Sequence, residues 1–233
     1  ADFMMDIKMA KTPEAAQKLM GTIWEAAIKR AKEEAAELQK LIDSENGGFK
    51  LEGWDWMYYT EKLRKAKYSL DENEIKPYFQ LENVRNGAFD CANKLFGLSF
   101  KSRTDIPVYH DSVKIFEVFD DENKHLGIFY GDYFPRSSKR SGAWMTNFVN
   151  QLNLGEYNVR PMIVNVCNFT PASGSTPSLL NIDETLTLFH EFGHALHGLM
   201  TKAHYPSVSG TNVKHDFVEL FSQIYEHWAM EPE

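Results

Sequence analysis

Hydrophobic positions follow a helical period at both ends of the chain and a strand-like pattern between them. From position 12 to about position 42, apolar residues recur every three or four positions, and Asn46-Gly47-Gly48 ends the run. Thr12 is suited to cap a helix, and Pro13 is suited to its first turn. We therefore predict one long helix with an apolar stripe formed by Ala16, Leu19, Met20, Ile23, Trp24, Ala27 and Ile28.

Two more helical stretches follow, at 54–67 and at 71–96, the latter with Pro77 near its first turns and Gly97 at its end. The aromatic residues of the first stretch suit either core packing or a binding surface. Packing is the favoured interpretation because aromatic side chains contribute heavily to protein cores. These residues are Trp54, Trp56, Tyr58 and Tyr59.

The middle of the chain is rich in β-branched and aromatic residues. Residues 113–119 (VKIFEVF) and 127–134 (GIFYGDYF) flank the polar segment DDENKH, a pattern that predicts an antiparallel hairpin. Residues 160–169 (RPMIVNVCNF) predict another strand, and 171–177 predict a loop.

The helical period returns at 181–201 and again at 215–229. The predicted fold is therefore mainly α with a small antiparallel or mixed β-sheet. We expect a helical region at 1–110 and a region at 111–233 that holds the sheet and the last two helices, both within one continuous fragment.

Composition excludes some classes of protein. The 233 residues carry a net charge of -8 without a basic cluster, which argues against a nucleic-acid partner. No apolar run approaches the ~20 residues that a membrane span needs. The two cysteines are isolated and suit free thiols in a reducing compartment. We expect a monomer in the cytoplasm, with the periplasm as the alternative.

Both ends of the chain look cut. It begins Ala1-Asp2-Phe3 without a methionine, and it stops at Glu233 shortly after a strongly patterned helix. We therefore expect a fragment of a longer protein, so the lack of a signal segment says little about the compartment.

The stretch FHEFGHALHGLM (189–200) contains the pattern His-Glu-x-x-His. His190 and His194 are four positions apart, so both rings project from one face of a helix and reach one metal ion. Glu191 is placed to act as the general base for the water that attacks a carbonyl. Zinc suits this site, because it accepts imidazole and carboxylate and keeps an open position for substrate.

The third ligand decides the subclass. The metzincin pattern fails, because His197 and Met200 stand where it needs glycine and histidine. A glutamate from the following helix remains. Glu219 stands among apolar residues, an environment in which a bound dication would compensate its charge. Glu226 lies two turns later on the same face, as a rival ligand or as a partner of one.

Two further residues are candidates near the site. Asp183 lies seven positions before His190 on about the same helix face. It is either an acceptor for the N–H of a ligand ring or an acid that complements the helix dipole. His197 lies one turn beyond His194, and three imidazoles of one helix do not easily converge on one ion. We place His197 beside the ligands rather than among them.

The sequence resembles the thimet oligopeptidase, oligopeptidase A and bacterial peptidyl-dipeptidase family of zinc metallopeptidases, and is most similar to the peptidyl-dipeptidase branch. Four segments carry the resemblance, in the family's order and spacing. They are GIFYGDYFPRSSKRSGAW (127–144), NFTPASGSTPSLL (168–180), IDETLTLFHEFGHALHGLM (182–200) and SGTNVKHDFVELFSQIYEHWA (209–229).

The resemblance implies a zincin-like catalytic core with one zinc ion per chain, short peptides as substrates and release of C-terminal dipeptides. It implies His190, His194 and Glu219 as zinc ligands and Glu191 as general base. An edge strand of the sheet would pair with the substrate backbone. Gly210 matches a family stretch near the cleft, where glycine allows close approach of a peptide; a simple connection between helices is the alternative.

The sequence departs from the family in two ways. Phe221 stands where the family usually has proline. Family members also continue with a helical region that supplies tyrosine and histidine groups for substrate binding and oxyanion stabilisation. The catalytic core is therefore expected to be incomplete. The alternative function is a non-catalytic zinc- or peptide-binding fragment, and a purely structural metal site is a third hypothesis.

Overall fold

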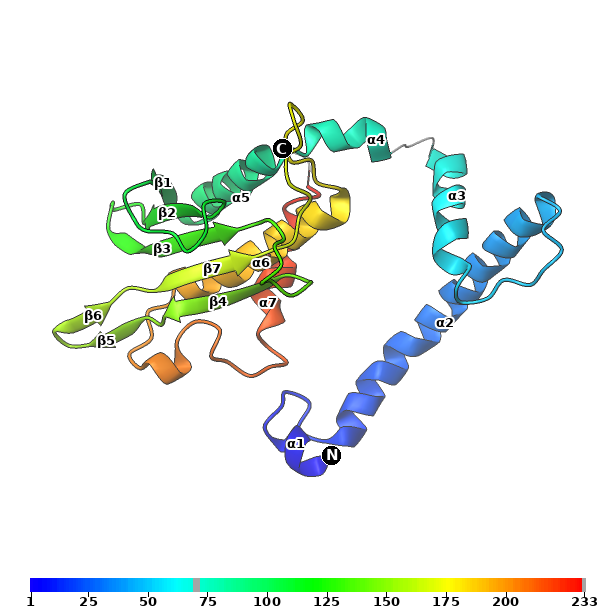
Figure 1. Cartoon of the computed structure of the whole chain (residues 1–233). Coiled ribbons are helices and arrows are strands. Elements are labelled where there is room, and N and C mark those ends of the chain that lie inside the picture. Colours follow the sequence, from blue (N-terminus) through cyan, green and yellow to red (C-terminus); the bar gives the residue numbers. More distant parts are fainter. Residues whose placement is uncertain (69–71, 232–233) are drawn as a thin grey trace. The chain divides into compact units, whose positions relative to one another are not determined.

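The computed structural model describes residues 1–68 and 72–231 (Figure 1). The chain divides into two compact units, Ala1–Glu74 and Ile75–Glu233. The expected start of the third helix, Asp71, lies outside the described residues.

The first unit is helical, with α1 (Asp2–Asp6), α2 (Pro13–Ser44) and α3 (Trp56–Tyr68), and α4 (Glu72–Ile75) follows at its end. The predicted long helix is confirmed as α2. Its N-cap is Thr12, whose Oγ1 accepts a hydrogen bond of 3.1 Å from the backbone N–H of Ala15. Asn46 and Gly48 have φ angles of 57° and 66°, so the chain leaves the helix through left-handed positions.

Burial in the first unit is concentrated where the end of α2 meets α3. Leu38, Ile42 and Tyr59 are buried, and Trp56 packs beside them. Packing is therefore confirmed for two of the four predicted aromatics, whereas Trp54 and Tyr58 are exposed. The apolar stripe of α2 is largely exposed within this unit, at Leu19 62%, Met20 60%, Ile23 63% and Trp24 64%.

The second unit contains a five-stranded mixed sheet with the strand order β1-β2-β3-β7-β4. Its strands are β1 (Ser99–Arg103), β2 (Lys114–Phe119), β3 (His125–Asp132), β4 (Trp144–Val149) and β7 (Met162–Val166). The predicted hairpin is β2–β3, and the predicted third strand is β7, which runs parallel to β3. The strands β1 and β4 were not predicted. Neither was the separate pair β5 (Leu152–Leu154) and β6 (Tyr157–Val159).

Three longer helices complete this unit: α5 (Leu81–Phe96), α6 (Ile182–Leu199) and α7 (Glu219–His227). The predicted helix at 71–96 is interrupted, because the 3-10 turn Lys76–Tyr78 is followed by an extended segment. There the N–H of Leu81 bonds to Ser178 O at 2.9 Å, and the N–H of Leu180 bonds to Phe79 O at 2.8 Å. The last helix begins later than predicted, since residues 215–218 form turns.

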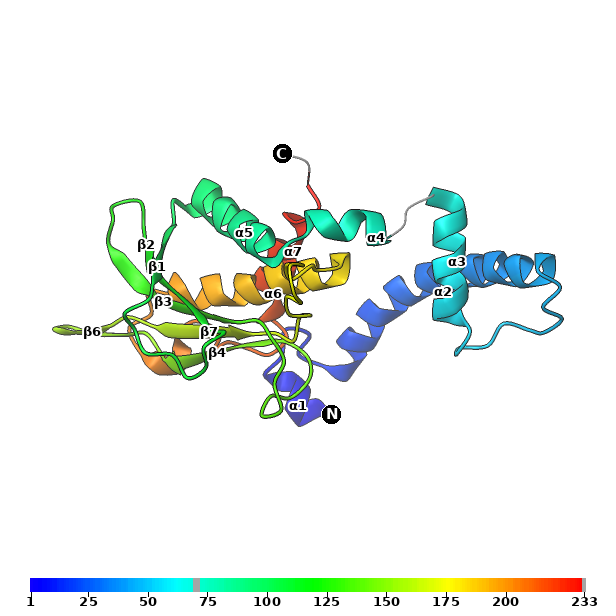
Figure 2. The same ribbon diagram turned by 45° about the horizontal axis from the view of Figure 1, so that its top comes forward.

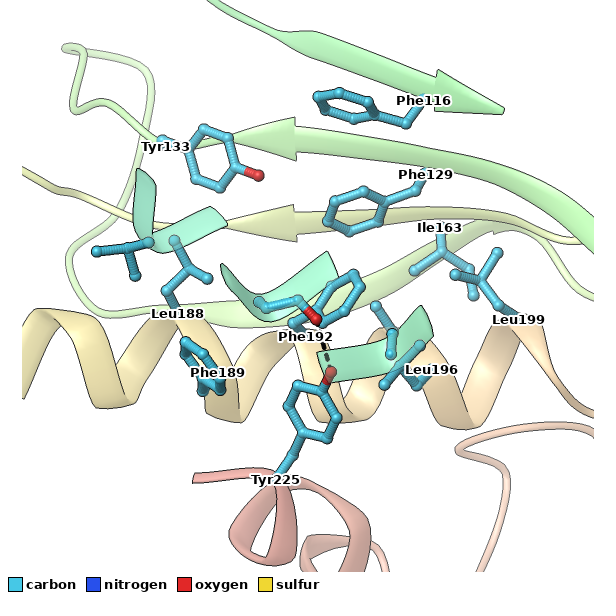
Figure 3. Packing of buried hydrophobic residues seen from close by; sticks show 14 of the residues in the cluster. Phe116, Phe129, Tyr133, Ile163, Leu188, Phe189, Phe192, Leu196, Leu199 and Tyr225 are labelled. Carbon is cyan, nitrogen blue, oxygen red and sulfur yellow. Dashed lines mark hydrogen bonds between the residues drawn. The ribbon is translucent and has the colours of Figure 1, made fainter. Parts of the chain in front are cut away.

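Both α5 and α6 lie on one face of the sheet (Figure 2), and α7 packs against α6. Figure 3 shows the resulting core, in which Phe129 and Ile163 of the sheet meet Phe192 and Leu199 of α6. Tyr225 of α7 extends this core and donates a hydrogen bond of 2.7 Å to Ala88 O of α5. The opposite face of the sheet buries a smaller cluster of Val113, Ile115, Tyr130, Val164 and Val166.

The boundary between the compact units differs from the sequence-based division at 110. It falls between Glu74 and Ile75, because α5 buries Val84, Ala88 and Ala92 in the same core as the sheet. The predicted combination of dominant helices with a small mixed sheet is confirmed. Among the described residues, no helix is long and apolar enough to cross a bilayer.

Candidate metal centre

The helix that carries the motif, α6, is fixed at both ends. Asn181 and Glu184 form a capping box: Asn181 Oδ1 accepts from Glu184 N at 2.7 Å, and Asn181 N donates to Glu184 Oε2 at 2.9 Å. At the other end, Arg160 donates to Leu199 O at 3.0 Å and to Leu126 O at 2.7 Å. These contacts join the end of α6 to strand β3, so the helix is held against the sheet.

The three predicted ligands meet at one point. Glu219 Oε2 lies 3.2 Å from His190 Nε2 and 3.1 Å from His194 Nε2. One ligand atom from each of these residues lies within 4.8 Å of the others. Glycine makes this convergence possible: a Cβ on Gly193 would stand 2.8 Å from Phe221 O, so α6 and α7 approach closely.

Glu219 is the first residue of α7, and its carboxylate accepts a hydrogen bond of 2.7 Å from Ser222 Oγ. Its apolar neighbours do not bury it: the Glu219 side chain is 47% exposed, because Leu220 and Phe221 point to other sides of the helix and are themselves exposed. The pKa of Glu219 is below its ordinary value. Partial burial raises it, but the Ser222 hydroxyl and the two histidine rings outweigh that effect.

Glu226 contacts one of the three donor residues, His190, and is not itself among the converging donors. Its Oε1 lies 2.6 Å from His190 Nδ1, which leaves the Nε2 of that ring facing Glu219. A carboxylate on the second nitrogen fixes the tautomer and orientation of a ligating imidazole. Of the two roles considered for Asp183, the contact with a histidine ring is made by Glu226 instead. Asp183 stands exposed in the first turn of α6, where an acid complements the helix dipole.

His197 lies on the side of α6 that faces α7, where its ring centroid is 4.3 Å from that of Phe221. It is not one of the three converging donors. Burial lowers the pKa of His197 and also that of His194. For His194 this favours the neutral ring, which is the form that binds a metal.

Glu191 is buried beside the donors, and its Oε2 has no hydrogen-bond partner in the described part of the chain. Burial raises the pKa of Glu191 to about 7, an effect that nearby His190 opposes and Glu219 reinforces. A carboxyl group with a pKa near neutrality both takes up and releases a proton at physiological pH.

The cavity beside the motif has a volume of about 300 Å³ and is lined in part by His190, Glu191, His194 and Glu219. Another wall of the cavity is formed by Ala143 and the first residues of β4, which is one of the two edge strands of the sheet. Thr211 and Val218 complete the lining. The sequence did not predict that β4 forms this wall, and it did not predict the hydrogen bond from Ser222 to Glu219. The only sequence signal for the Ser222 contact was its spacing, three positions after Glu219 on a helix.

Gly210 packs against α6 rather than against the cavity wall. It has φ of 54°, and a Cβ there would lie 3.0 Å from Gly198 Cα. Its N–H also bonds to Thr201 Oγ1 at 3.2 Å. The glycine is therefore explained by contact between a loop and a helix, and its expected approach to a peptide stays a prediction.

The donor set fits a catalytic zinc ion. Two imidazole nitrogens and one carboxylate oxygen converge from one side, and the cavity leaves the other side open. His190 already has a carboxylate partner on its second nitrogen, which is typical of a ligating histidine.

The sequence model of peptidase family M3 matches residues 1–233. The chain belongs to this family. Dipeptidyl carboxypeptidase of Salmonella typhimurium LT2 is 50% identical over 233 residues, which are 100% of this chain and 34% of the relative. Dipeptidyl carboxypeptidase of Escherichia coli K12 is 51% identical over 227 residues, 97% of this chain and 33% of the relative. Oligopeptidase A of Salmonella typhimurium LT2 is 37% identical over 228 residues, 97% of this chain and 34% of the relative.

The predicted family is thus confirmed over the whole chain, including the N-terminal helices that carry no motif. The chain spans about a third of the length of these curated M3 relatives.

Proposed function

We propose that this M3 protein is a zinc-dependent peptidase that hydrolyses short peptides and releases dipeptides from their C-terminus. The convergence of His190, His194 and Glu219 on one point, with Glu191 beside them, is the observation that carries the proposal. The names of the two most similar relatives given above support the dipeptidyl specificity.

Zinc, when bound by these three residues, would polarise the scissile carbonyl and increase the acidity of a water molecule. Glu191 removes the proton from that water and later delivers it to the leaving amine. Glu226 holds His190 in the tautomer that leaves Nε2 free. Ser222 holds the Glu219 carboxylate toward the two rings.

Strand β4 is proposed as the strand that pairs with the substrate backbone. It is an edge strand, so one row of its N–H and C=O groups has no partner strand among the described residues. An extended peptide added to this edge would run through the cavity between β4 and α6.

Hydrolysis of a short fluorogenic peptide by the zinc-loaded chain tests the proposal. Activity should require zinc and fall by about two to four orders of magnitude in Glu191→Gln, as expected for loss of a general base. Bound zinc, measured by atomic absorption, should stay at one per chain. Stoichiometric zinc without chelator-sensitive turnover would instead favour the alternative, a non-catalytic zinc- or peptide-binding fragment.

A pair of glutamate variants tests the ligand assignment. Glu219→Ala should abolish zinc binding, whereas Glu226→Ala should weaken it by roughly 10- to 100-fold, the usual effect of losing a partner of a ligand. The reverse order would show that Glu226 is the ligand. Loss of zinc in His197→Ala would show that the ligand set is wrong.

We further propose that the protein acts in the cytoplasm, because Cys91 and Cys167 are free thiols, which suit a reducing compartment. We also propose that it is a monomer. A periplasmic location is the alternative. Size-exclusion chromatography and cell fractionation test these two points.

A further inference from the structure

The segment that connects β3 to the cavity wall, residues 133–143, is anchored at its start by Asp132. Asp132 is the last residue of β3 and is 1% exposed. Arg136 donates to both of its oxygens at 2.8 Å through Nη1 and Nη2, and Tyr109 OH donates to Oδ2 at 2.9 Å. Burial alone would raise the pKa of Asp132, but these hydrogen bonds and the one from Lys139 hold it below its ordinary value.

Lys139 closes the first half of the segment into a turn. Its side chain is 3% exposed, and Nζ lies 3.0 Å from Asp132 Oδ1. The same ammonium group donates to Asp132 O at 3.0 Å and to Phe134 O at 2.7 Å. All three donors of the ammonium group are therefore used inside this turn.

A second anchor holds the other end of the segment. Asn168, two residues after β7, donates from Nδ2 to Arg140 O at 2.9 Å and to Gly142 O at 2.7 Å. Gly142 has φ of 90°, a left-handed position that glycine adopts without strain. The guanidinium of Arg140 stacks over the Trp144 ring at 4.4 Å.

The second anchor ends where the cavity wall begins. Ala143 follows Gly142 directly, and Ala143, Trp144 and Met145 face His190, Glu191 and Glu219 across the cavity. In the sheet, β4 is bonded to β7 and to no other strand of the described chain. The backbone at 143–145 is thus fixed from one side by β7 and from its start by Asn168.

We propose that Asn168 is a positioning residue, which with the Asp132–Lys139 pair sets the backbone of residues 143–145 at a fixed distance from the metal centre. The role rests on the proposed function, because a substrate strand on β4 must present its carbonyl next to Glu191. A shift of about 1 Å in such an alignment costs roughly a hundredfold in rate. Asn168 itself is neither one of the three donors nor one of the residues that line the cavity.

Asn168→Asp tests this role, because aspartate keeps the size of the side chain and removes both N–H donors. Asn168→Ser keeps one donor, and Asn158→Ala on the exposed strand β6 is the control. Lys139→Met tests the first anchor independently. Hydrogen–deuterium exchange of the peptide covering residues 143–149 is measured in the zinc-loaded chain, together with zinc affinity, kcat and KM.

We expect exchange at 143–149 to become roughly tenfold faster in Asn168→Asp, as expected for loss of two hydrogen bonds, with partial recovery in Asn168→Ser. Zinc affinity should stay within about twofold of the parent chain, while kcat falls more than KM rises, since the donors and the base are untouched. Lys139→Met should act in the same direction and Asn158→Ala should not.

Unchanged exchange at 143–149 in Asn168→Asp would overturn the proposal, whatever the peptidase activity. Loss of zinc affinity in that variant would overturn it as well, because Asn168 would then act through the metal centre. If the parent chain binds zinc but hydrolyses no peptide, the proposed function fails, while the exchange measurement still tests the positioning role of Asn168.

Discussion

Two helices of this chain, α2 and α6, have amphipathic sequences but different surroundings. The apolar stripe of α2 is more than half exposed at Leu19, Met20, Ile23 and Trp24 within the first unit. The apolar residues of α6 are buried against the sheet on one side and against α5 and α7 on others. The period of the apolar residues identifies the face of a helix, whereas the neighbouring elements decide whether that face is covered.

The two helices also differ in the surroundings of their ionisable side chains. In α6 the apolar residues are buried in the core, whereas His190, Glu191 and His194 line the cavity. Their surroundings shift the pKa of Glu191 upward and that of His194 downward. In α2 the charged residues are solvated, as in the exposed pair Arg30–Glu34. The two histidines of the candidate metal centre therefore lie on the helix whose apolar face is covered.

The largest effect is expected from truncating a large apolar side chain in each helix. Phe192 is 1% exposed in the core of α6, and Ile23 is 63% exposed on α2. Phe192→Ala should lower the free energy of unfolding of the second unit by about 3–5 kcal/mol through the cavity it creates. Ile23→Ala should change the stability of the first unit by less than about 0.5 kcal/mol.

Urea titration followed by hydrogen exchange separates the two units in this experiment. Exchange is read on peptides from α2 and from α6, and Leu63→Ala at the partly covered contact of α3 serves as an intermediate case. A loss for Ile23→Ala comparable to that for Phe192→Ala would mean that the α2 stripe is covered in solution.

A medium effect is expected from adding one methyl group to a glycine of each helix. A Cβ on Gly193 would meet backbone atoms of α7, Phe221 O and Ser222 Cα, both at 2.8 Å. Gly193→Ala should cost about 1–3 kcal/mol of stability and weaken zinc binding, because α7 and Glu219 must move outward. Gly21 has nothing within 4 Å of its Cβ position, so Gly21→Ala should stabilise α2 by about 1 kcal/mol.

Chemical denaturation and isothermal titration with zinc check these two variants. Because both helices gain the same intrinsic preference for alanine, the difference between them isolates the contact of α6 with α7. Equal stabilisation by the two substitutions would show that α7 moves away from α6 at little cost. The close packing of the two helices would then not determine the position of Glu219.

The smallest effect on stability is expected from lowering the pH. The pKa of Asp132 is lowered in the folded chain, so its contribution is complete above its unfolded value of about 3.9 and is lost as the pH falls through the folded value. In the first unit the pKa of exposed Glu37 is lowered by its hydrogen bond with Lys67. The stability of the second unit should fall below about pH 4 whether or not salt is added, since Asp132 is buried.

The acid response of the first unit should shrink as salt is raised, because salt screens exposed charges. Urea titrations at pH 5 and pH 3, at low and high salt, measure both responses. Asp132→Asn should reduce the acid-dependent change of the second unit, and Glu219 and Asp105, whose pKa values are also lowered, should contribute the remainder. A strong salt dependence there would contradict the buried environment of Asp132.

Much of the second unit could be predicted because its signals are local. The capping box of α6, the spacing of His190 and His194, and the polar turn between β2 and β3 are each contained within a few residues. The failures have a common cause in contacts between distant segments. Strand β1 (SFKSR) has a single apolar residue, and it forms by pairing with β2. Likewise, backbone pairing between 79–81 and 178–180 interrupts the predicted third helix.

The candidate site shows the same limit. The sequence favoured Glu219 and kept Glu226 as its rival, and which of the two meets the histidines depends on how α7 packs against α6 at Gly193. Asp183 has suitable spacing to His190, yet Glu226 reaches that ring from another helix. Asp132 was overlooked, although an acid inside an apolar strand followed by Arg136 and Lys139 is a recognisable signal for a buried ion pair.

The strand order also constrains how the site assembles. In the sheet, β7 lies between β3 and β4, although β4 comes earlier in the chain. Strand β4 therefore has no strand to join until β7 has been synthesised and has paired with β3. The two histidines of α6 follow β7 by about twenty residues, and Glu219 of α7 comes later still. On a growing polypeptide, the paired β7–β4 wall of the cavity would therefore exist before Glu219, the residue that completes the three converging donors.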